Sequence, residues 1–156
     1  MKLSINEVML LEHTIVYTGE TEIQNDKEVL SKRTFNVLEI VQRRHFNKNT
    51  KELFDKFIEL EKERIAFIEK TKTDDPKKEG ESQEEYEERL NSFLSKNEEA
   101  MELGKKHVET RKEEHEIEMT DKTKSFLRKY FEEFGEEHGY NDSDGEVVES
   151  LSEKLK

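Results

Sequence analysis

The chain has 156 residues, which suits one ordinary domain, but only 31% of them are hydrophobic while 42% are charged. So few apolar residues favour helices, whose exposed sides can carry charge, over a sandwich of two sheets. The net charge of −12 disfavours nucleic acid and anionic membranes as main partners, and the absence of cysteine excludes disulfides and thiolate metal sites.

We expect a mostly α-helical fold: an elongated antiparallel helical hairpin or three-helix bundle over residues 1–112, and a strand–helix–helix extension over 113–156. The two parts are expected to pack as one domain. Residues 71–81 contain the only proline and should form a flexible loop. The longest apolar run, Val8 to Leu11, is too short to cross a membrane, so the expected location is cytoplasmic.

The first expected helix begins at Ser4, because Ser4 and Glu7 match the S-x-x-E pattern of a capping box. It ends near Gly19. Residues 13–18 are rich in branched and aromatic side chains, so this stretch is alternatively read as extended.

Asn25 and Glu28 predict the start of a second helix, over residues 25–46. Its expected inward side chains are Leu30, Thr34, Val37, Leu38 and Val41. Asn47 and Asn49 should end it, so that the next helix, 49–70, turns back as its antiparallel neighbour. This third helix carries two adjacent apolar stripes and is expected to lie between two others, with Phe57 and Ile65 buried.

Ser82 and Glu85 predict a fourth helix, which packs on the second stripe of helix 49–70 and has a bend or a close contact at Gly104. The alternating sequence EHEIEMT predicts a strand over 114–120.

That strand could pair with residues 14–18 as a small two-stranded ribbon. Thr120 or Asp121 should begin an aromatic-rich helix that ends at Gly135. Ser143 and Glu146 should begin the last helix.

The chain lacks the common signatures of enzymes and metal sites. Its five histidines match neither H-E-x-x-H nor E-x-x-H, and no phosphate-binding loop or nucleophile elbow occurs. The segment NDSDG resembles a calcium loop, but fixing Gly145 at its sixth position puts Tyr140 and Leu151 where carboxylates are needed. We therefore expect no enzymatic activity, no cofactor and no bound metal.

Charge is unevenly distributed along the chain. Residues 27–56 carry a net charge of +4, whereas 74–118 and 130–150 each carry −8. The basic run of residues 42–48 is the one candidate for contact with nucleic acid. We favour a role in helix stabilisation or in pairing with acidic groups, because cations near the end of a helix favour its dipole.

Residues 126–137 supply two sets of candidate partner-binding side chains. Phe126, Tyr130 and Phe134 share one side of the expected helix, where they either form an apolar docking patch or complete the core. The carboxylates of Glu132, Glu133, Glu136 and Glu137 could instead contact a basic partner.

The segments MKLSINEVMLLEHTI, SKRTFNVLEIVQRR, LFDKFIELEKERIAFIEKT and GEVVESLSEKL together resemble small uncharacterised phage proteins encoded near tail genes. The resemblance implies a phage protein that acts through protein contacts. The leading hypothesis is a non-enzymatic helical interaction module, a structural or assembly accessory that acts in the host cytoplasm or the virion. Self-association is compatible with it. The alternative is an acidic inhibitor that occupies a basic or nucleic-acid-binding surface of a host or defence protein.

Overall fold

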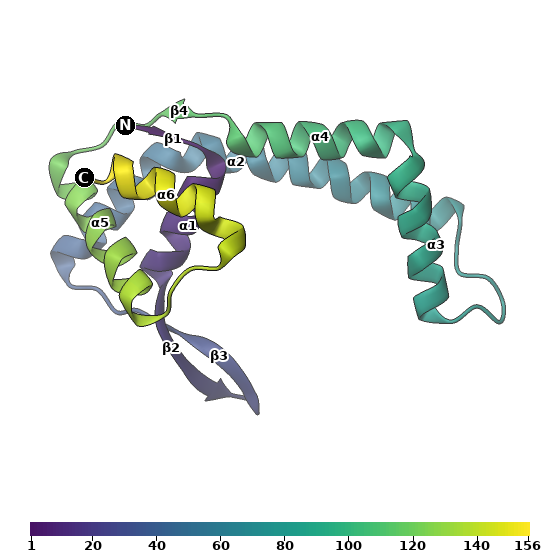
Figure 1. Ribbon diagram of the computed structural model, residues 1–156, viewed down its shortest axis with the longest axis horizontal. Helices are drawn as coiled ribbons and strands as arrows, with labels where there is room; N and C mark the ends of the chain where they lie inside the picture. Colours follow the sequence, from purple (N-terminus) through teal and green to yellow (C-terminus); the bar gives the residue numbers. More distant parts are fainter. The chain divides into compact units, whose positions relative to one another are not determined.

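The computed structural model describes all 156 residues, and Figure 1 shows the course of the chain. The protein is mostly α-helical, at 70%, with six α-helices and two small two-stranded antiparallel sheets. It forms two compact units: unit 1 comprises Met1–Leu53 and Glu113–Lys156, and unit 2 comprises Phe54–Lys112. Residues 113–156, which were expected to pack on residues 1–112, share unit 1 with the first 53 residues.

The helices are α1 (Ile5–Val16), α2 (Val37–Asp74), α3 (Gln83–Lys96), α4 (Glu98–Lys112), α5 (Asp121–Glu137) and α6 (Gly145–Lys154), with a short 3-10 helix η1 (Asp142–Asp144). The strands are β1 (Lys2–Leu3), β2 (Tyr17–Gln24), β3 (Lys27–Lys32) and β4 (His115–Glu116). None of the helices is long and apolar enough to cross a membrane.

Three of the expected helix starts are confirmed. Ser4 with Glu7 and Ser82 with Glu85 form complete capping boxes, and the Thr120 side chain accepts a bond from the backbone of Thr123. The expected cap at Ser143 is wrong, because η1 occupies residues 142–144 and α6 begins at Gly145 without a side-chain cap.

The helix expected over residues 25–46 is wrong in its first half, where the chain forms a β-hairpin. Strands β2 and β3 pair antiparallel, with Gln24 opposite Lys27, and Figure 1 shows the hairpin projecting from the helices of unit 1. Asn25 and Asp26 make the turn at φ values of 51° and 60°. Asparagine and aspartate tolerate this left-handed conformation, which two-residue hairpin turns require.

The expected break at Asn47 and Asn49 is also wrong, since α2 runs without interruption from Val37 to Asp74. Its start is at Asn36, whose side chain accepts from the Glu39 backbone while the Glu39 carboxylate accepts from the Asn36 backbone, in a capping-box arrangement. The Asn49 amide does not end the helix and instead donates a 2.8 Å bond to the Glu118 carbonyl. The antiparallel hairpin of helices 25–46 and 49–70 therefore does not exist.

The predicted strand near residue 115 exists but has a different partner. β4 pairs antiparallel with β1, with Lys2 opposite Glu116 and Leu3 opposite His115, while β2 pairs with β3. The expected ribbon between residues 14–18 and 115–119 is therefore wrong. The N-terminal ammonium adds bonds of 3.0 Å to the Ile117 carbonyl and to the Glu116 carboxylate.

The hydrophobic core lies in unit 1, where α1 packs against α5 and α6. Its fully buried aliphatic members include Leu3, Ile5, Val8, Leu11, Ile15, Leu127, Leu151 and Leu155. Glu7 is 3% exposed and joins α1 to α6, because its carboxylate accepts 2.7 Å bonds from Ser150 and Lys154. Burial alone would raise the pKa of Glu7, but these bonds outweigh it and the pKa is lowered.

In unit 2, α4 lies antiparallel to the second half of α2, as the ion pair between Lys106 and Glu63 and the contact between His107 and Glu61 show. The expected contact between these segments is confirmed. The helical path is interrupted at Asn97, between α3 and α4, and Gly104 lies inside the continuous α4. The expected loop 71–81 begins later, because α2 continues to Asp74.

The core of unit 2 is thin. Leu60, Tyr86 and Leu90 are its only buried hydrophobic residues, and α4 contains none. Ile65, which was expected to be buried, is 50% exposed, and Phe57 is only partly buried. The expected position of this helix between two others is therefore wrong.

Candidate partner-binding surface

The first turns of α2 expose an apolar surface. Val37 and Leu38 are each 76% exposed, Val41 is 53% exposed and Ile40 is 39% exposed. We call these four side chains the α2 apolar face. Val37, Leu38 and Val41 were predicted to face inward, so the structure reverses the expected orientation of this part of the helix.

The inward side of the same turns is polar. The Glu39 carboxylate accepts a 2.7 Å bond from the Tyr130 hydroxyl and a 2.9 Å bond from the Lys129 ammonium, both on α5. These bonds, together with that from the Asn36 backbone, lower the pKa of Glu39 to about 2. The start of α2 is thus held on α5 by a charged network.

The next turn continues the polar contact with unit 1. Gln42 accepts a 2.9 Å bond from the Thr123 hydroxyl, and Arg43 donates a 2.8 Å bond to Glu12. Only from Phe46, which is 1% exposed, does an apolar side chain of α2 enter the core. Because buried polar groups need hydrogen-bond partners, these specific bonds fix which side of α2 faces inward.

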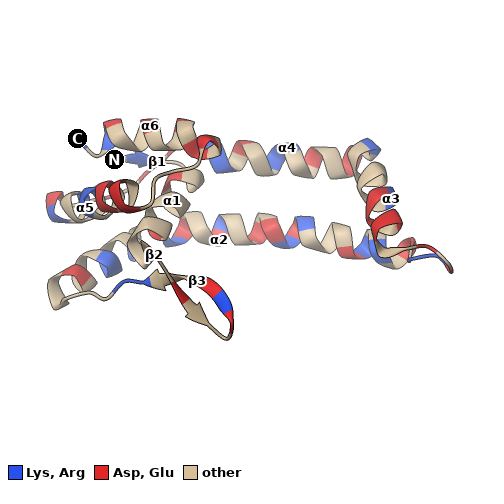
Figure 2. Ribbon diagram, turned by 60° about the horizontal axis from the view of Figure 1, so that its bottom comes forward, with Lys and Arg blue, Asp and Glu red and all other residues tan.

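Basic side chains extend the α2 apolar face along the helix. Val37, Val41, Arg44 and Lys48 follow one another at spacings of four, three and four residues, which places them on one line of an α-helix. Arg44 and Lys48 are exposed, like the two valines. Figure 2, in which Lys and Arg are blue and Asp and Glu are red, shows charged residues of both signs along α2.

The aromatic candidates Phe126, Tyr130 and Phe134 are brought together on α5, but all three are buried, at 6%, 4% and 3% exposure. Phe126 and Tyr130 meet edge to face at 5.0 Å between ring centroids. The ring centroid of Phe134 lies 5.3 Å from that of His13 on α1 and 5.2 Å from that of His138. Their burial favours the reading in which they complete the core.

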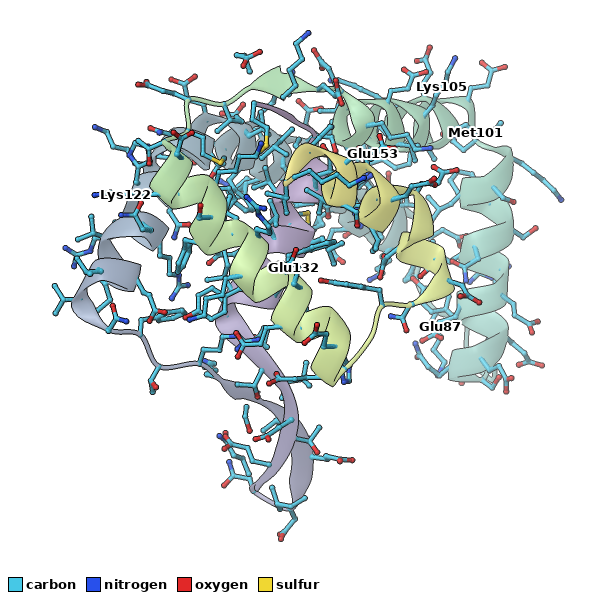
Figure 3. The ribbon with its side chains drawn as sticks, turned by 60° about the vertical axis from the view of Figure 1, so that its left-hand side comes forward. Glu87, Met101, Lys105, Lys122, Glu132 and Glu153 are labelled. Atoms are coloured by element: carbon cyan, nitrogen blue, oxygen red, sulfur yellow. The ribbon has the colours of Figure 1, made fainter.

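The four acidic candidates on α5 are divided by their contacts. Glu133 and Glu137 face Arg33, at 3.1 and 3.9 Å, whereas Glu132 and Glu136 are exposed. Glu132 is labelled in Figure 3. Arg33 therefore pairs with two of the four, although Glu137, whose side chain is 44% exposed, also lies open to solvent.

Arg33 joins the hairpin to the helical core. Its Nε donates bonds of 3.1 and 2.9 Å to the carbonyls of Thr14 and Tyr17, at the end of α1 and the start of β2. Its guanidinium carbon lies 4.8 Å from the centre of the Tyr130 ring. The side chain is 6% exposed, so it connects these elements inside the protein and is not part of a basic surface.

The α2 apolar face was not predicted from the sequence, because apolar periodicity was taken to indicate which side of this helix faces the core. One signal was available: Asn36 and Glu39 have the N-x-x-E spacing of a capping box, which would have placed the helix start there.

No protein-family model, curated protein or solved structure matches the chain.

Proposed function

We propose that the chain is a non-enzymatic protein-interaction module that binds a protein partner through the α2 apolar face and the adjoining cations Arg44 and Lys48. The observation that carries the proposal is the reversed polarity of α2, with valine and leucine outward and Glu39, Gln42 and Arg43 inward. Large contiguous exposed apolar patches commonly mark interaction sites.

The surface chemistry supports one kind of occupant, an amphipathic helix with acidic residues along one end. Its apolar side would cover the valines and leucine, and its carboxylates would lie beside Arg44 and Lys48. Full burial of an exposed aliphatic side chain is worth about 1.5–3 kcal/mol, and the four are 39% to 76% exposed, so covering them would contribute roughly 4–7 kcal/mol. Association costs about 4–15 kcal/mol, so the apolar contacts alone support only a weak, reversible complex.

The resemblance to small phage proteins encoded near tail genes suggests where the partner would be found. We propose a virion or assembly component, met in the cytoplasm of the infected cell. Nothing in the proposal requires a cofactor, a metal ion or a membrane.

Photo-crosslinking tests the location of the surface. A photoreactive phenylalanine analogue at Leu38 or Val41 should crosslink to one protein in infected cells, and the same analogue at the exposed Lys122 on α5, labelled in Figure 3, should not. The purified partner should then bind Arg44→Glu more weakly, with a reduced salt dependence, since such charges act mainly on association rates. Equal crosslinking from Lys122, or an unchanged affinity of Arg44→Glu, would argue against the proposal.

A further inference from the structure

We propose that two copies of the chain associate through unit 2, with α4 of one copy antiparallel to α4 of the other. This surface is separate from the α2 apolar face of unit 1, and either proposal can fail without the other.

The first observation is that α4 leaves apolar side chains uncovered. Met101 and Val108 are 57% and 53% exposed and lie two helical turns apart, on one side of the helix. Figure 3 labels Met101 together with the exposed Lys105. None of the residues of α4 is buried, so packing within the chain does not use this side.

The second half of α2 extends the same face. Ile58 and Ile65, also seven residues apart, are 46% and 50% exposed. At the α3 end of this layer, Ile68 of α2 and Met101 of α4 line one open pocket of about 330 Å³ together with Leu94 of α3. A helical layer with one uncovered apolar face is half of a four-helix bundle.

Charge favours a second copy as the occupant of this face. The line of α4 that carries Met101 and Val108 begins at Glu98 and ends at Lys112, while Lys105 at its centre pairs with Glu109 of the same helix at 3.9 Å. In an antiparallel pair with Met101 opposite Val108, Glu98 of each copy lies beside Lys112 of the other. α4 is therefore complementary to itself in that orientation, whereas a parallel pair would bring like charges together.

Gly104 fits the midpoint of such a pair. If Met101 lies opposite Val108 of the other copy, the centre falls between residues 104 and 105. A Cβ at Gly104 would have no heavy atom within 4 Å, so the chain's own packing does not require glycine there. Glycine in a helix costs about 1 kcal/mol of stability relative to alanine. At the centre of a helix pair, however, the missing side chain lets the two backbones approach closely.

The size of the face sets the expected affinity. The 15 residues of α4 make a helix about 22 Å long, and two helices side by side are about 20 Å wide, which gives roughly 450 Å² per copy. Stable interfaces bury about 800 Å² per partner, so we expect a weak dimer, with a dissociation constant of the order of 10 to 100 μM.

Sedimentation velocity of the full chain, from about 5 to about 500 μM, tests the proposal. The wild type should shift from monomer to dimer, and Val108→Asp should weaken the dimer at least tenfold. Ile23→Asp is the matched control, because Ile23 is 72% exposed on the hairpin of unit 1. Thermal melts should be unchanged in both variants. A wild type that stays monomeric, or equal weakening by Ile23→Asp, would overturn the proposal.

A charge exchange tests the orientation. Glu98→Lys and Lys112→Glu should each weaken the dimer alone, and an equimolar mixture of the two variants should form a heterodimer. A dimer of unchanged affinity in each variant alone, or a mixture that stays monomeric, would contradict the antiparallel pairing. As a further readout, Gly104→Leu should weaken the dimer without lowering the melting temperature of the monomer.

Discussion

The Tyr130 hydroxyl donates a 2.7 Å hydrogen bond to the Glu39 carboxylate, and this bond decides which side of α2 faces unit 1. Glu39 is also the acidic member of the capping box with Asn36. One carboxylate thus starts the helix, docks it on α5 and leaves Val37, Leu38 and Val41 outward.

This network should make stability depend on pH. The pKa of Glu39 is lowered to about 2 in the folded chain, against about 4.3 for an unperturbed glutamate. A lowered pKa stabilises the fold above the unfolded value and loses that contribution as the pH falls toward the folded value. The difference in melting temperature between wild type and Glu39→Gln should therefore be largest above about pH 5 and shrink toward pH 2. A difference that stays constant from neutral pH to pH 2 would argue against an ionised Glu39 as the docking group.

The orientation of α2 predicts that substitutions at two apolar residues of this helix change the free energy of unfolding by very different amounts. Phe46→Ala should destabilise the chain by about 3–5 kcal/mol, because its side chain is 1% exposed. Val41→Asp should change the free energy of unfolding by only about 0.5 kcal/mol, because that side chain faces solvent. Urea denaturation measures both. Comparable losses in the two variants would mean that Val41 is buried.

The buried contacts of Arg33 should contribute more to the stability of the fold than those of an ordinary surface cation. Arg33→Ala removes two bonds to carbonyls, at Thr14 and Tyr17, and the ion pair with Glu133, and should cost about 2–3 kcal/mol. Arg33→Lys should recover little of this, because an ammonium cannot reproduce the forked geometry. Thermal denaturation compares the variants, and full rescue by lysine would show that only the charge is important.

The sequence predicted the helical class and three helix starts, because the S-x-x-E and threonine caps are local patterns that the backbone uses directly. It did not predict the hairpin. Asn25 was read as a helix cap, although Asn25-Asp26 between two branched and alternating stretches is also a turn that tolerates positive φ. The two readings differ in whether residues 17–24 pair with 27–32, and a cap pattern at Asn25 alone does not decide this.

The candidate surface was missed for a related reason. Apolar periodicity predicts which residues share a side of a helix, but the side that faces inward is chosen by its partners. Here the bonds from Tyr130, Lys129 and Thr123 outweigh the burial of valine and leucine. Conversely, Phe126, Tyr130 and Phe134 were correctly placed on one side of a helix, and all three are buried, Phe134 beside His13 of α1 and the other two beside Phe35.

The alternative, an acidic inhibitor, can be tested at the exposed residues Glu132 and Glu136 of α5. If a basic partner binds there, Glu132→Gln/Glu136→Gln should slow its association and flatten the salt dependence, with no change in stability. Glu133→Gln, in contrast, should lower the melting temperature because it removes the partner of Arg33. Unchanged association by the first double variant would remove this alternative.

Thiol labelling tests the central claim most directly, because the chain has no cysteine of its own. In the free protein, Val41→Cys should react with a maleimide at close to the rate of Lys122→Cys, and Phe46→Cys should react far more slowly. In the complex with the crosslinked partner, labelling of Val41→Cys should slow at least tenfold while Lys122→Cys is unaffected. Slow labelling of Val41→Cys in the free chain, or no protection of it in the complex, would contradict binding through the α2 apolar face.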